Sequence, residues 1–166
     1  IGDSVDLPLY AEKEKLEDFI YDCLSYKSMI VEKDERDSFE RKILNLGHTL
    51  GHAIEEDSGY EISHGEAVAN GVLMMAESSF RAFRMSRNDI EKIRNAFIKT
   101  GIEKVGFSSV DDIRKYVSKD KKIAADGDID AVLINAPGEC GISRMSIDSF
   151  IDYVAESAVY NPYSDN

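Results

Sequence analysis

The sequence predicts a mainly α-helical domain, a helical bundle with a short β-hairpin. Three observations support this. Apolar residues recur every three to four positions along most of the chain. Serines three residues before an aspartate precede two of these stretches, as at helix starts. One short apolar run, at 128–135, leads into the turn-forming letters "APGECG". With 166 residues and 43% hydrophobic composition, the whole chain suits a single domain.

The expected elements follow in chain order. An apolar stripe predicts a first helix over residues 11–31, and a second is expected over 39–57, stopped at Gly59. A third is expected over 64–85 and a fourth from Ser86 to Gly101. A short fifth opens at Ser109. One or two strands follow at 128–135, and a last helix is expected over 145–160.

Charge and composition exclude several classes of partner. The net charge is −12, so nucleic acid and anionic membrane surfaces are poor candidates, and no apolar run is long enough to span a bilayer. Two cysteines, Cys23 and Cys140, are too few for a disulfide framework and favour reduced thiols in a cytoplasmic protein. The start, "IGDSVDLPLY", does not resemble a signal peptide, and we expect a piece of a longer protein.

All three histidines lie within a 17-residue window. His48 and His52 are four apart, so a helix places both on one face, and His64 follows after a loop that can fold back. Three neutral imidazoles can hold Zn²⁺ and leave one position open for water or substrate. A bare pair of histidines at this spacing is common by chance. The third histidine and the neighbouring glycines favour a metal or anion site.

Glycines surround these histidines. A glycine inside a helix costs about 0.5–1 kcal/mol relative to alanine. Close approach of a ligand or a neighbouring helix is the expected compensation for those at 47, 51, 65 and 71. Asn45 lies three residues before His48 and, on a continuous helix, shares its face.

Longer motifs carry a resemblance to a known family. The stretches "RKILNLGHTLGHAIE" and "HGEAVANGV", with "SKDKKIAADGDIDAVLIN" further on, resemble the sugar-phosphate cyclases, and most closely the 3-dehydroquinate synthases. That family has a dinucleotide-binding N-terminal half and a mainly helical C-terminal half, and this chain is similar to the second. We find no glycine-rich phosphate loop after a strand, so NAD is expected to bind mainly to the other half.

The resemblance implies a different ligand set from the spacing alone. In the family, the positions matching His48 and His64 bind zinc, or Co²⁺ or Mn²⁺ in its place. The third ligand is a glutamate in an upstream G-x-x-E-x-x-K segment that this chain lacks. The position matching His52 faces the substrate. We prefer this reading because the motif is far more specific than the spacing.

Further site residues are implied one by one. Catalytic roles fall on His52, Asn45 and Asp37. Substrate contacts fall on Lys27, Arg41, Asn45, His52 and one or both of Lys121 and Lys122. The chain also departs from the family: Asp37 stands where glutamate is usual, Phe39 where glycine is common and Asn70 where the helix is usually apolar.

The resemblance implies an NAD- and zinc-dependent lyase of the shikimate pathway, which leads to chorismate and the aromatic amino acids. Its substrate is a phosphorylated keto acid, 3-deoxy-arabino-heptulosonate 7-phosphate, which becomes 3-dehydroquinate as phosphate leaves. We expect a homodimer at full length and an inactive fragment in isolation. The alternatives are another sugar-phosphate cyclase of the aminocyclitol type and a degenerate, non-catalytic metal-binding helical module.

Overall fold

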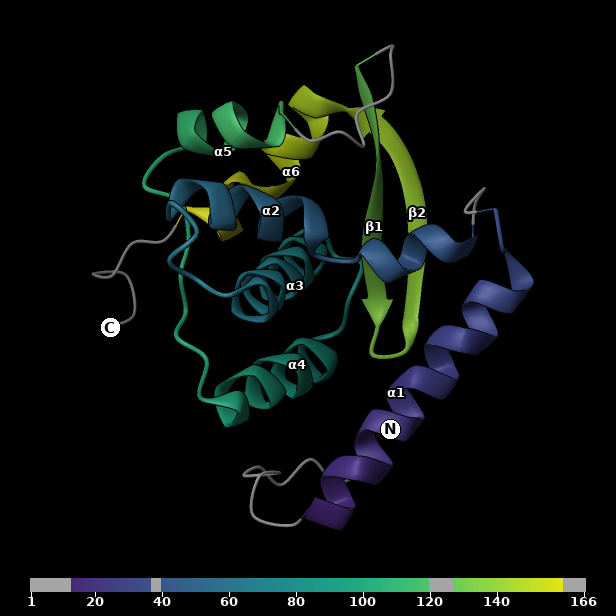
Figure 1. Ribbon diagram of the computed structural model, residues 1–166. Coiled ribbons are helices and arrows are strands. Elements are labelled where there is room, and N and C mark those ends of the chain that lie inside the picture. The colour runs from purple at the N-terminus through teal and green to yellow at the C-terminus, as the bar shows by residue number, and fades with distance from the viewer. Residues whose placement is uncertain (1–12, 37–39, 120–126, 160–166) are drawn as a thin grey trace.

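The computed structural model describes residues 13–36, 40–119 and 127–159 (Figure 1). Within these ranges the chain forms helices and one antiparallel two-stranded sheet. In chain order the elements are α1 (Lys13–Lys33), the 3₁₀ helix η2 (Glu40–Asn45), α2 (His48–Asp57), α3 (His64–Arg81), α4 (Arg87–Thr100), α5 (Val110–Val117), β1 (Asp128–Ala136), β2 (Glu139–Ser146) and α6 (Ile147–Ala158).

The predicted fold class, a helical bundle with a β-hairpin, is confirmed. The start signals of two helices hold: the Ser86 side chain caps α4 and the Ser109 side chain caps α5. Gly101 ends α4 in the left-handed conformation, with a φ of 70°. No described helix combines the length and apolar character needed to cross a membrane.

The helix expected over 39–57 is wrong as a single element. It divides into η2 and α2 at Gly47, whose φ of 74° is left-handed and cannot continue a helix. Asn45 and His48 therefore do not share one helix face, which corrects the argument from spacing. The last helix also begins later than expected, at Ile147, because Met145 pairs with Ile129 in the hairpin.

The core lies where α2, α3, α4, α5 and α6 pack together with the hairpin (Figure 1). Its largest fully buried side chains are Phe107, Phe150, Leu50, Ile90, Ile113, Ile129 and Ile151. In β1 the stretch from Ala131 to Ile134 is entirely buried, which explains the apolar run in the sequence. Helices α2 and α3 cross near the centre, so the histidine window lies on the main body of the domain.

Helix α1 stands apart from this body and contacts η2 near its C-terminal end (Figure 1). Of its described side chains, Ile30 is buried, whereas most of the predicted apolar stripe is exposed. The exposed members include Phe19, Ile20, Leu24 and Tyr26. Cys23, on the same helix, and Cys140, in β2, are both free thiols, as expected.

Asn70 is a buried polar residue that joins α3 to the segment before α5. Its side chain is 1% exposed. Its amide nitrogen donates to the carbonyl oxygens of Glu66 and Glu103, each at 3.0 Å, and its oxygen accepts from the backbone N–H of Val105 at 2.9 Å. The asparagine at this position, where the family's helix is usually apolar, therefore links α3 to the segment before α5 by hydrogen bonds.

We expect Asn70→Leu to lower the free energy of unfolding by about 2–4 kcal/mol, because a buried donor and acceptor lose their partners. Urea denaturation measures this change. Asn95→Ala, at an exposed position on α4, is the matched control and should change stability by less than about 0.5 kcal/mol. Equal stability of the two variants would contradict the assignment.

Candidate metal and substrate site

The site is built where the backbones of α2 and α3 touch. A Cβ atom on Gly71 would lie 2.1 Å from the carbonyl oxygen of Gly47, and one on Gly47 would lie 2.6 Å from the backbone nitrogen of Val72. A Cβ atom on Gly51 would lie 3.0 Å from the Cα atom of Val68. The predicted compensation for these three glycines is thus a neighbouring helix. Gly65 has nothing within 4 Å of its Cβ position, so the explanation does not extend to it.

This close crossing gathers the three imidazoles. The ring centroids of His48 and His64 are 5.6 Å apart, those of His52 and His64 are 5.8 Å apart, and those of His48 and His52 are 5.9 Å apart. His48 is the first residue of α2, His52 lies one turn later, and His64 is the first residue of α3. The loop between the helices does fold back, as the sequence predicts.

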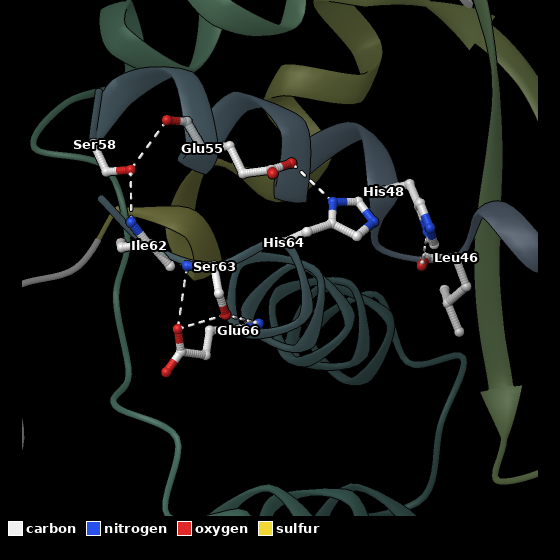
Figure 2. Close-up of polar contacts among 8 residues, drawn as sticks. All are labelled: Leu46, His48, Glu55, Ser58, Ile62, Ser63, His64 and Glu66. Carbon is white, nitrogen blue, oxygen red and sulfur yellow. Dashed lines mark hydrogen bonds and ion pairs between the residues drawn. The ribbon is translucent and has the colours of Figure 1, made fainter. Parts of the chain in front are cut away.

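Hydrogen bonds hold two of the three rings by one nitrogen each (Figure 2). The Nδ1 atom of His48 lies 3.1 Å from the carbonyl oxygen of Leu46, and the Nδ1 atom of His64 lies 3.0 Å from Oε2 of Glu55. A carbonyl and an ionised carboxylate accept only, so each Nδ1 carries the proton. In a neutral imidazole with this proton the lone pair is on Nε2, and this is a form in which histidine binds metals.

The start of α3 fixes the backbone that carries His64. Ser63 and Glu66 form a capping box, in which the Ser63 hydroxyl donates to Glu66 Oε2 at 2.6 Å and the Glu66 N–H donates back to that hydroxyl (Figure 2). The hydroxyl and backbone N–H of Ser63 hold the pKa of the Glu66 carboxyl below its usual value. A fixed helix start places His64 beside α2.

Glu55 and two of the histidines form a second group of potential metal ligands, different from the pair His48 and His64. Among the described residues, His52, Glu55 and His64 each offer a ligand atom within 4.8 Å of the others. Glu55 is 16% exposed and His64 is 56% exposed, so the group opens to one side. Two nitrogens and a carboxylate oxygen are a donor set that zinc accepts.

Asn45 lies at a cavity of about 260 Å³ between η2, α2 and β1. Polar groups line one part of it, where Lys42 Nζ lies 2.6 Å from Oδ2 of Asp130. Leu50 and Phe150 line the apolar remainder. Gly47, the residue before His48, also borders the cavity. The cavity that Asn45 lines therefore lies next to the start of the histidine cluster.

The remaining predicted substrate residues are not all brought together. The Arg41 guanidinium donates to the carbonyl oxygen of Glu35 at 3.3 Å, so it lies against the segment after α1. Lys27 is exposed on α1. Asp37, Phe39, Lys121 and Lys122 lie outside the described residues.

Reasoning from the sequence missed three residues here: Glu55, Lys42 and Asp130. Glu55 carried a usable signal, because positions 48, 52 and 55 share one face of α2. The pairing of Lys42 with Asp130 joins residues 88 positions apart, which no local pattern reveals.

A family model described as 3-dehydroquinate synthase C-terminal matches residues 3–123. The chain is 43% identical over 103 residues to the 3-dehydroquinate synthase of Nitrosospira multiformis, covering 61% of this chain and 28% of that protein. It is 36% identical over 140 residues to the enzyme of Clostridium perfringens (strain 13), covering 83% and 40%. The chain thus spans less than half the length of these relatives.

Solved structures agree on the fold. A 2-deoxy-scyllo-inosose synthase complexed with carbaglucose-6-phosphate, NAD⁺ and Co²⁺ matches with a TM-score of 0.71 at 26% identity, over 86% of this chain and 42% of that one. A 2-epi-5-epi-valiolone synthase from Streptomyces hygroscopicus, with NAD⁺ and Zn²⁺ bound, matches in fold with a TM-score of 0.64 at 14% identity, over 76% and 35%. The family match covers most of the chain, and the fold agrees with it. The chain belongs to the 3-dehydroquinate synthase C-terminal family.

Proposed function

We propose that this chain is the metal- and substrate-binding half of a 3-dehydroquinate synthase. The observation that carries the proposal is the pair His48 and His64 within the family's motif, whose Nδ1 atoms contact the Leu46 carbonyl oxygen and the Glu55 carboxylate. The whole enzyme converts 3-deoxy-arabino-heptulosonate 7-phosphate to 3-dehydroquinate and phosphate. As a lyase it serves the shikimate pathway in the cytoplasm.

The residues present fit a divalent metal. Two imidazole nitrogens are borderline ligands that suit Zn²⁺, Co²⁺ or Mn²⁺, and a carboxylate from upstream is the expected third ligand. When bound, the metal supplies a Lewis acid for the reacting hydroxyl and NAD⁺ supplies a transient hydride acceptor. The metal is held by His48 and His64, and NAD mainly by the N-terminal half.

The chain's other residues bind and orient the substrate. His52, exposed beside both ligand rings, hydrogen-bonds the substrate and relays a proton. Asn45 hydrogen-bonds the substrate, and Asp37 supplies an acidic group. Four cationic side chains bind the substrate's carboxylate and phosphate: Lys27, Arg41, Lys121 and Lys122.

An N-terminal dinucleotide-binding half is the expected partner of this domain. The relatives are more than twice as long as the matched region, and α1 exposes Ile20, Leu24 and Met29 on a helix that stands off the body. Burial of such side chains is favourable, so that half is the proposed occupant of this face. The full-length protein is expected to be a homodimer.

A second candidate substrate class rests on the solved structures. The 2-deoxy-scyllo-inosose synthase shares the fold and was crystallised with a hexose phosphate analogue. A cyclase acting on a hexose phosphate would use the same metal histidines. The 43% and 36% identical relatives favour the dehydroquinate branch.

We expect the isolated chain to release no phosphate from either substrate, because the intermediates need enclosure between two domains. A version extended upstream to the length of the relatives should release phosphate from the heptulosonate phosphate and form 3-dehydroquinate when NAD⁺ and Zn²⁺ are supplied. Phosphate release from glucose 6-phosphate instead would support the aminocyclitol alternative. Inactivity of the folded, extended protein on both would support the degenerate module.

A further inference from the structure

We propose that Glu55 is a positioning residue that fixes the tautomer and orientation of His64, so that Nε2 of His64 faces the metal. This inference rests on the proposed metal role of His48 and His64. It concerns Glu55, to which neither the family resemblance nor the spacing argument gave a role.

The contact joins a largely buried carboxylate to an imidazole ring that is 56% exposed. Oε2 of Glu55 lies 3.0 Å from Nδ1 of His64, and the Glu55 side chain is only 16% exposed. An ionised carboxylate has no proton to donate, so His64 must donate from Nδ1. Carboxylate–histidine–metal arrangements of this kind orient the ring and raise its basicity as a ligand.

The backbone is held in place at both Glu55 and His64. The carbonyl oxygen of Glu55 accepts from the Ser58 hydroxyl at 3.0 Å and from the N–H of Tyr60 at 2.8 Å (Figure 2 shows the first bond). His64 begins α3 directly after the capping serine, Ser63. The carboxylate and the ring therefore meet because two helix ends are held, although they are nine residues apart in sequence.

The proposed role differs from direct ligation by Glu55, in which His52, Glu55 and His64 would share the metal. Figure 2 shows His64 between Glu55 and His48, with Nδ1 toward the carboxylate and Nε2 on the side of His48. The centroids of the two rings are 5.6 Å apart. His48 and His64 would hold a shared metal by Nε2, the ring nitrogen that faces away from Glu55. His48 follows the same scheme, with a backbone carbonyl in place of the carboxylate.

Imidazole ¹⁵N NMR tests the proposal without metal. The chain has three histidines, so a sample with labelled histidine gives three ring systems, assigned by single histidine-to-glutamine variants. At about pH 8, above the usual histidine pKa, His64 should carry its proton on Nδ1. In Glu55→Ala the population should shift toward Nε2–H, and Glu55→Gln, whose amide oxygen still accepts, should shift it less. Glu56→Gln, one residue along α2, is the matched control and should leave His64 unchanged.

Titration with CoCl₂ tests whether Glu55 strengthens metal binding. Glu55→Ala should weaken Co²⁺ binding by about 10–100-fold, while the visible spectrum of the saturated protein keeps the shape of the parent. An Nε2–H tautomer in the parent, an unchanged tautomer in Glu55→Ala or a saturated spectrum that has lost a carboxylate ligand would each overturn the proposal. Failure of the extended enzyme to make 3-dehydroquinate would overturn the proposed function and leave the tautomer result standing.

Discussion

Alanine in place of His48 or His64 is expected to weaken Zn²⁺ or Co²⁺ binding by more than about 100-fold, a larger loss than changes in the residues that hydrogen-bond to metal ligands cause. Each variant removes one of the two Nε2 ligands that we propose for this chain. Isothermal titration with either metal measures the change, and circular dichroism checks that the helices remain. In the extended enzyme the same variants should lose nearly all turnover.

His52→Ala is the informative comparison, because His52 lies in the same cluster. We expect its metal affinity to stay within about threefold of the parent, since only changes in the ligands or their partners cost tenfold or more. In the extended enzyme it should lower kcat by about 10²–10⁴-fold, the usual contribution of acid–base catalysis. If His52→Ala loses metal binding as His64→Ala does while His48→Ala keeps it, the ligand group is instead His52, Glu55 and His64.

Gly71→Ala is expected to destabilise the domain by about 3 kcal/mol, at the upper end of overpacking effects. Its Cβ atom would lie 2.1 Å from the Gly47 carbonyl oxygen, which is backbone and cannot rotate away. Relief requires α2 to separate from α3, so His48 moves away from His64. Urea denaturation should show the loss of stability, and metal affinity should fall with it.

Gly65→Ala supplies the matched control in the same helix. Nothing lies within 4 Å of its Cβ position, and alanine favours a helix by about 0.5–1 kcal/mol over glycine. Its stability should therefore equal or exceed that of the parent. If Gly71→Ala proves as stable as Gly65→Ala, the close backbone contact does not hold the site together.

Local signals in the sequence predicted the helices well where a cap was present. Ser86, Gly101 and Ser109 each mark a boundary by a backbone or side-chain hydrogen bond within a few residues. The break at Gly47 was not predictable in this way. A glycine is compatible with a helix interior, and the left-handed turn there is explained by the packing of Val72 and Gly71 against it.

The candidate site likewise has a part that local sequence signals predict and a part that depends on tertiary packing. The motif and the spacing indicated the three histidines, because two lie one turn apart and the third follows a short loop. The contact between Glu55 and His64, and the pairing of Lys42 with Asp130, depend on how separate elements cross. Such crossings follow from the tertiary fold and leave little trace in a single sequence.

The most direct test is an anomalous-difference map at the zinc edge, from a crystal of the chain equilibrated with millimolar ZnCl₂. The account predicts one peak within bonding distance, about 2.0–2.1 Å, of Nε2 of both His48 and His64, with His52 outside that distance. A peak bound by His52 and Glu55 without His48, or rings of His48 and His64 that share no peak, would contradict it.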